Sequence, residues 1–207
     1  MRVCEALVSI EGNHLVPLAV FLGILVPAAA QSAGIDAALL ARANAGDPAA
    51  QVAVGEEYAQ AAATEHDKSR MADDYQQELK WYRKAADQNY IGGEMDLAAL
   101  YRDGGGKTVP RDMEQAAVWY RKAADQGDPT AQATLGLLYS MGQGVPHDDV
   151  EAYFWLDLAA SVKGPNQEKY AVNSRLIGER ITADELSDVE DREAAWKAAH
   201  PRPDGTN

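Results

Sequence analysis

The sequence is nearly without cysteine, with Cys4 as the only thiol among 207 residues. One thiol excludes a framework of internal disulfides, which small secreted domains otherwise use for stability. Basic residues are also scarce, since 19 Lys and Arg face 32 Asp and Glu, for a net charge of −13. No cluster of Lys and Arg occurs, and nucleic-acid binding depends on such clusters. The charge therefore argues against a nucleic-acid partner and leaves a basic partner open.

Runs of β-branched residues are rare as well, whereas alanine is abundant. Alanine has the highest helix propensity, so this composition predicts an all-α protein. A chain that is 46% hydrophobic and 25% charged over this length is large enough to bury the core of one globular domain.

Long apolar runs are limited to Leu15–Ala30, which is shorter than the ~20 residues of a membrane-spanning helix. The run ends in three alanines, as a signal-peptide cleavage site does. We therefore expect residues 1–30 to be a signal peptide, and the mature chain to be secreted into the periplasm. A signal peptide usually begins with a positive charge, but here Glu5 and Glu11 outweigh Arg2. Two alternatives therefore stay open: the segment is kept as a membrane anchor, or the true start of the protein lies downstream of Met1. Membrane contact is expected only if the segment is kept.

The feature that the sequence does have is an internal repeat. The eight residues Trp81–Gln88 recur letter for letter at Trp119–Gln126, 38 residues later, and a weaker copy follows at Phe154–Ala160. The six residues Gly46–Gln51 match Gly127–Gln132 at an offset of 81, with Ala49 against Thr130 as the one difference. A fixed period of this length indicates a repeat array, here with a unit of first helix, turn and second helix.

Three segments carry a family resemblance: Leu135–Tyr139 in a first helix, Gly142–Asp148 in a turn, and Ala116–Ala124 in a second helix. Together they resemble the Sel1-like repeat, a relative of the tetratricopeptide repeat. The resemblance implies a right-handed α-solenoid of about three helix-turn-helix units with helical caps. The first unit departs from the pattern, because 23 residues separate Tyr58 from Trp81, and we expect an enlarged turn there.

The same reading divides the chain into five segments. Solenoids need their end faces covered, so helices outside the repeats are interpreted as caps. The expected segments are the signal peptide at 1–30, an N-terminal capping helix at 31–45, Sel1-like repeats at 46–163, C-terminal capping helices at 164–200, and a disordered tail at 201–207.

Packing within the units follows from the repeated residues. The tryptophans and tyrosines are expected to fill the gaps between units, and the alanines to let helices approach. Gly55 and Gly136 stand inside first helices, where glycine costs ~1 kcal/mol against alanine, so each indicates a close approach of a neighbouring helix. Asp47 and Asp128 each precede a proline and are expected to cap the helix that follows.

Three motifs have chemical alternatives that we considered and rejected. Gly104–Thr108 ends like a phosphate-binding loop, but Tyr101 stands where that motif needs its first glycine. His147–Asp149 and Glu65–Asp67 have metal-ligand residue types without the spacing of a structural zinc site. Neither a cofactor nor a metal is therefore expected. No nucleophile, base and oxyanion arrangement is recognisable, so catalysis is not expected either.

Resemblance to the family implies a non-catalytic protein–protein interaction scaffold or adaptor of the bacterial cell envelope. Partner contact is expected on the concave face, which first helices line in such arrays. Polar positions expected to be exposed there, for example Glu56, Asp96, Arg102 and Thr134, are the first candidates for this contact. Two alternatives stay open: a hydrolase with the groove as substrate cleft, and a structural subunit of an envelope complex.

Overall fold

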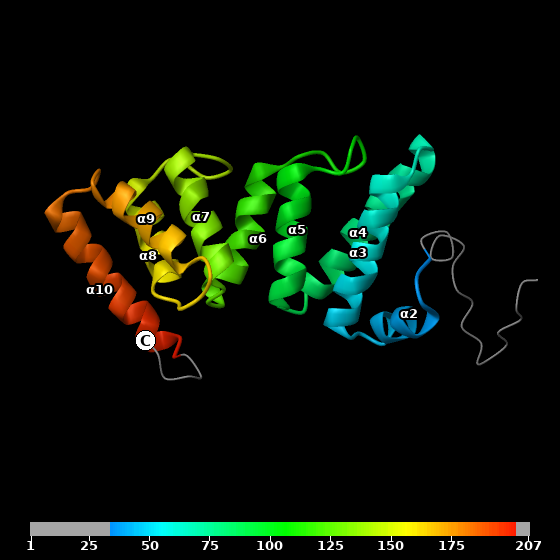
Figure 1. The fold of residues 1–207 in the computed structure, drawn as a ribbon, viewed down its shortest axis with the longest axis horizontal. Helices are drawn as coiled ribbons and strands as arrows, with labels where there is room; N and C mark the ends of the chain where they lie inside the picture. Colours follow the sequence, from blue (N-terminus) through cyan, green and yellow to red (C-terminus); the bar gives the residue numbers. More distant parts are fainter. Residues whose placement is uncertain (1–33, 202–207) are drawn as a thin grey trace, which may run out of the picture.

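The computed structural model describes residues 34–201, and the expected signal peptide and nearly all of the expected tail lie outside this range. Within it the chain forms nine helices and no strand (Figure 1). They are α2 (Ala37–Asn44), α3 (Pro48–Thr64), α4 (Lys68–Ala86), α5 (Ile91–Asp103), α6 (Met113–Asp125), α7 (Pro129–Met141), α8 (Asp149–Ala160), α9 (Gln167–Gly178) and α10 (Ala183–Ala199).

The helices stand side by side in one row, with α2 at one end and α10 at the other (Figure 1). Each helix from α3 to α8 packs on the next, and the pairs α3–α4, α5–α6 and α7–α8 are the three repeat units. The prediction of an α-solenoid of helical hairpins is therefore confirmed, while its right-handed sense stays a prediction.

Both ends of the row are covered by further helices. At the amino end α2 packs on α3 and buries Leu40 and Ala43. At the carboxyl end α9 and α10 both pack on α8. Helix α10 begins with a capping box, in which Thr182 and Glu185 bind each other's backbone amides. Among residues 34–201 no helix is long and apolar enough to cross a membrane.

The first unit is enlarged in its helices, and the expectation of an enlarged turn is wrong. Helix α3 has 17 residues and α4 has 19, whereas α5, α6 and α7 have 13 each. Only Glu65–Asp67 separates α3 from α4. Asp67 caps α4, since its side chain accepts hydrogen bonds from the amides of Ser69 and Arg70. Asp74 occupies the register of the later caps Asp112 and Asp148, but here it lies inside the helix.

The repeated tryptophans are interior, as predicted. Trp81, Trp119 and Trp155 are 5%, 4% and 2% exposed. A repeated arginine joins consecutive units. The Arg83 guanidinium lies 5.2 Å from the Trp119 ring centroid, and that of Arg121 lies 5.1 Å from the Trp155 ring centroid. Each of these arginines also donates a hydrogen bond to the tyrosine hydroxyl of the next first helix, Tyr101 or Tyr139.

Gly136 marks a close approach between α7 and α8. A Cβ added there would lie 2.8 Å from Cγ of Leu156 and 2.9 Å from the Ala152 carbonyl oxygen. We expect Gly136→Ala to lower the free energy of unfolding by about 1–2 kcal/mol in urea titrations, because overpacking outweighs the gain in helix propensity. Gly164→Ala is the control, since a Cβ there meets nothing within 4 Å. Equal stability of the two variants would contradict the close approach.

Candidate functional site

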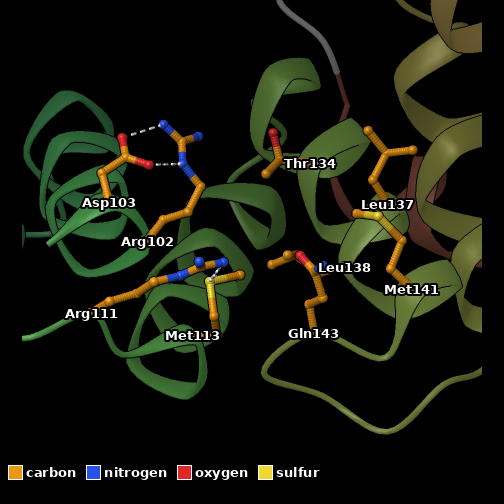
Figure 2. Close-up of a pocket in the computed structure, with 9 residues that line it drawn as sticks. All are labelled: Arg102, Asp103, Arg111, Met113, Thr134, Leu137, Leu138, Met141 and Gln143. Carbon is orange, nitrogen blue, oxygen red and sulfur yellow. Dashed lines mark hydrogen bonds and ion pairs between the residues drawn. The ribbon is translucent and has the colours of Figure 1, made fainter.

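A solvent-open hollow of about 380 Å³ lies between α5 and α7, and we call it the α5–α7 groove (Figure 2). Its polar lining comes from the end of α5, from the loop before α6, from α7 and from the loop after α7. Its apolar lining comes from the start of α6 and one face of α7. The lining residues are Arg102, Asp103, Arg111, Met113, Thr134, Leu137, Leu138, Met141 and Gln143.

The charges of this groove are held in place by short contacts. Arg102 and Asp103 form an ion pair, with Nη2 and Oδ2 2.8 Å apart, and Arg102 also donates a hydrogen bond to the Tyr120 hydroxyl at 3.0 Å. The hydrogen bond from Arg102 lowers the pKa of Asp103 and keeps it ionised. The Thr134 hydroxyl donates a hydrogen bond to the Thr130 carbonyl at 2.7 Å.

A second hollow, of about 200 Å³, lies on the other side of α5, and we call it the α3–α5 pocket. Asp103 lines both hollows, so they adjoin at the end of α5. The pocket is lined by Ala59, Tyr75, Glu78, Tyr82, Asp96, Ala99, Leu100, Asp103 and Gly104. The carboxyl groups in this lining belong to Glu78, Asp96 and Asp103, and no lysine, arginine or histidine lines the pocket.

The two hollows contain three of the four residues expected to contact a partner. Arg102 and Thr134 line the α5–α7 groove, and Asp96 lines the α3–α5 pocket. Glu56 is exposed on α3 and lines neither hollow, although its negative charge raises the pKa of Asp96. Burial is the larger cause and brings the pKa of Asp96 to about 6. The role of all four in partner contact stays a prediction.

The sequence reading missed Glu78, which α4 contributes to the α3–α5 pocket. It missed this residue because it assigned the contact surface to first helices alone. A signal was nevertheless present three residues before each repeated tryptophan. The second and third units have Ala116 and Ala152 at that position, both fully buried. The first unit has Glu78, so a carboxylate replaces a core alanine.

The glycine-rich segment Gly104–Thr108 forms a tight turn between α5 and α6. The Gly105 amide donates to the Val109 carbonyl at 2.7 Å, and the Val109 amide donates back at 3.1 Å. Tyr75 covers Gly105, whose added Cβ would lie 2.7 Å from the tyrosine ring. The preceding element is a helix, so the strand that a phosphate-binding loop follows is absent here. Within residues 34–201 no group of three or more metal-ligating side chains could hold a metal ion.

Comparison with known proteins gives a match to the Sel1 repeat family at residues 74–90, 93–128 and 129–161. The first match begins at Asp74, the register of the later helix caps, and leaves out α3. Sel1-repeat proteins generally mediate protein–protein interactions, and the fold is typically a non-enzymatic scaffold. No curated protein matches the sequence.

Two solved structures resemble this fold. A Sel1 repeat protein from Oxalobacter formigenes is 29% identical with a TM-score of 0.52, over 64% of this chain and 92% of its own. A protective antigen present in uropathogenic Escherichia coli strains, displaying an SLR fold, is 24% identical with a TM-score of 0.52, over 77% of this chain. The chain spans only 40% of that antigen, so the likeness concerns the fold alone. The three matched segments and their stacked hairpins identify residues 74–161 as Sel1 repeats.

Proposed function

We propose that the chain is a non-catalytic scaffold or adaptor that binds a protein partner through the face formed by α3, α5 and α7. The observation that carries the proposal is the composition of the α5–α7 groove. Protein interfaces combine an apolar centre with a polar rim and are enriched in Met and Arg. The groove has Leu137, Leu138 and Met141 beside Arg102 and Arg111.

Exposure of apolar surface supports the same proposal. Met141 is 54% exposed at the groove, although methionine is a side chain that proteins usually bury. Flexible methionines adapt to the shape of a bound partner, which suits a docking surface. We further propose that the partner is a protein of the cell envelope, which the expected signal peptide at residues 1–30 would place in reach.

A site-specific crosslinking experiment tests the groove. A photoreactive amino acid is placed at Met141, and in a second protein at Val118, which is 50% exposed on α6 and lines neither hollow. We expect irradiation in envelope extracts to join one protein at stoichiometric yield to the Met141 position. The Val118 position should give at least tenfold less of the same product, as judged by quantitative mass spectrometry.

Affinity measurements with the identified partner complete the test. Met141→Asp is expected to weaken binding at least tenfold, because it buries a charge at an apolar contact, whereas Val118→Asp should change it less than twofold. Equal crosslinking from both positions would contradict the groove. Turnover of an envelope substrate without any stoichiometric partner would instead support the hydrolase alternative.

A further inference from the structure

We propose that the α3–α5 pocket receives a lysine or arginine side chain of the protein partner, with Glu78 and Asp96 as the groups that bind the cation. The inference rests on the proposed scaffold function and adds the chemistry that the partner must present. It is carried by the placement of Glu78, which the repeat fold itself does not need.

Glu78 is a carboxyl group without an ion-pair partner, at a position where burial disfavours a negative charge. Its residue is 6% exposed, and Oε2 has no hydrogen-bond partner within the described part of the chain. No ion pair to Glu78 occurs among residues 34–201 either. A buried carboxylate without a counter-charge is strongly unfavourable, so its presence at this position calls for an explanation. The alanines at the equivalent positions of the other two units show that the repeat packs without a charge there.

The pocket around Glu78 has the features of a cation site. Asp96 supplies a second carboxylate, and it forms no ion pair or hydrogen bond within residues 34–201. Asp103 is already neutralised by Arg102. Tyr75 and Tyr82 supply aromatic rings in the lining, and such rings attract an ammonium or guanidinium group. A water molecule takes ~30 Å³ of liquid volume, so a hollow of about 200 Å³ has room for the end of a long basic side chain.

A basic side chain fits this pocket better than a bare metal ion does. No group of three or more metal-ligating residues converges anywhere in the described range. A lysine or arginine brings its own methylene groups, which can pack against Ala59, Ala99 and Leu100 in the same lining. The formal charge of −13 on the whole chain also favours approach of a basic partner.

Titration with a model peptide tests the pocket. The probe is an end-capped peptide of four lysines separated by glycines, and its lysine-acetylated form is the first control. We expect the lysine peptide to bind at low ionic strength and the acetylated peptide not to bind. Amide shifts in NMR spectra should centre on residues 75–82 and 96–103, the segments that line the pocket.

Two variants separate the pocket from diffuse attraction. Glu78→Gln and Asp96→Asn should each lower the affinity at least fivefold. Asp188→Asn removes the same charge from an exposed position on α10 and should lower it less than twofold. Glu78→Gln is expected to fold, since it replaces a buried charge by a neutral amide, and Asp96→Asn tests the pocket independently. Equal losses in all three variants, or shifts spread over the whole row of helices, would overturn the proposal.

The two proposals can fail separately. If Met141 captures a partner but the lysine peptide ignores Glu78, the cation pocket is wrong and the scaffold stands. If the peptide binds at Glu78 while Met141 captures no more than Val118 does, the α5–α7 groove is wrong as the docking surface.

Discussion

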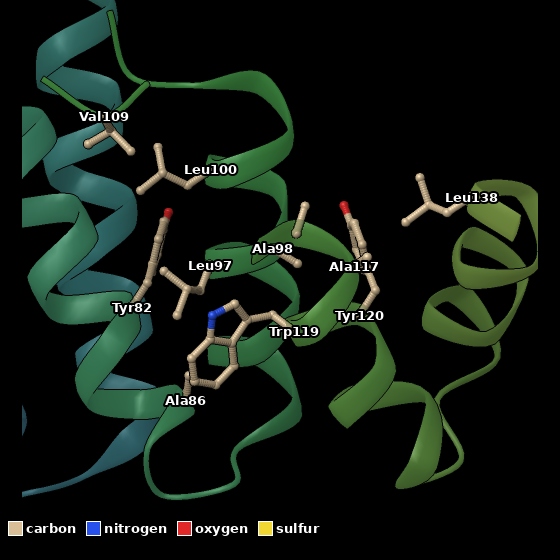
Figure 3. Packing of buried hydrophobic residues seen from close by; sticks show 11 residues of the cluster. Tyr82, Ala86, Leu97, Ala98, Leu100, Val109, Ala117, Trp119, Tyr120 and Leu138 are labelled. Atoms are coloured by element: carbon tan, nitrogen blue, oxygen red, sulfur yellow. The ribbon is translucent and has the colours of Figure 1, made fainter. Parts of the chain in front are cut away.

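Replacing Trp119 by alanine is expected to lower the free energy of unfolding by about 3–5 kcal/mol, the usual cost of truncating a core aromatic. The indole reaches from α6 toward Leu97 and Ala86, between two repeat units (Figure 3). Arg83 and Lys122 lie over its ring, at 5.2 Å and 3.8 Å from the ring centroid. Removal therefore opens a cavity at the junction of two units and releases both cations.

Chemical denaturation followed by circular dichroism measures this loss. Val118→Ala is the matched control, because Val118 is the neighbouring residue on α6 and is 50% exposed, and it should change stability by less than about 0.5 kcal/mol. Consecutive repeats stabilise each other through their shared interface, so the variant is also expected to unfold less cooperatively. A Trp119→Ala protein as stable as the control would mean that the indole does not hold the units together.

Much of this fold could be predicted from the sequence because identical residues recur at the positions where the repeat units contact each other. Identical Trp-Tyr-Arg-Lys-Ala-Ala segments 38 residues apart must occupy equivalent environments if the array is regular, and both tryptophans are indeed buried. The helix starts followed from chemistry that needs no tertiary context. Asp47 and Asp128 accept backbone hydrogen bonds at the first turns of α3 and α7, as the Asp-Pro pairs indicate.

The first unit could not be predicted in the same way because its sequence offers two helix starts. Asp67 and Asp74 are both suitable caps, and only packing decides between them. The structure uses Asp67, and Asp74 becomes 8% exposed inside α4. Burial raises the pKa of Asp74, so beginning α4 at Asp67 costs free energy by placing this carboxyl group in a buried position. The contact between the lengthened helices α3 and α4 favours the start at Asp67. Local helix propensity takes no account of this contact.

Only the polar half of the candidate site could be predicted from the sequence. Polar residues on first helices are visible in the sequence, and Asp96, Arg102 and Thr134 do line hollows. The apolar half of the groove could not be predicted, because leucine and methionine, as at Leu137 and Met141, are also typical core residues. Only the three-dimensional row of helices shows that they face the hollow between α5 and α7.

Acidic pH is expected to stabilise the protein relative to mildly basic pH, which is the reverse of the trend for carboxylates in ion pairs. Burial, with the charge of Asp96 nearby, raises the pKa of Glu78 from 4.5 to about 7. Burial also raises the pKa of Glu193 on α10 to about 7, and it outweighs the bond from Lys197 at 3.0 Å. Each group keeps its proton in the folded chain over a range where the unfolded chain has lost it.

The sign follows from proton linkage. The folded state binds more protons than the unfolded state between pH 4.5 and 7, so stability falls as pH rises through this window. A shift of this size corresponds to up to ~3 kcal/mol per group. The capping carboxylates Asp47 and Asp67 have lowered pKa values, so their contribution is lost only below about pH 4, outside the window.

Denaturant titrations at pH 5 and pH 8 measure this dependence. We expect the free energy of unfolding to be larger at pH 5 by on the order of 3 kcal/mol. Glu78→Gln should remove a large share of the difference by raising stability at pH 8, whereas Asp188→Asn should leave the difference intact. The charge of Asp96 on α5 contributes to the raised pKa of Glu78, the charge of Glu78 contributes to the raised pKa of Tyr82 on α4, and Glu56 on α3 acts on Asp96.

The same titrations connect stability with binding. A cation seated beside Glu78 would favour its ionised form, so the lysine peptide should stabilise the wild-type protein more at pH 8 than at pH 5. Glu78→Gln should show a smaller difference, because its amide does not titrate and only Asp96, with a pKa of about 6, still does so in the pocket. Equal stability of the wild-type protein and Glu78→Gln at pH 8 would show that the ionised Glu78 carboxylate costs no stability, and would remove the physical basis of the cation pocket.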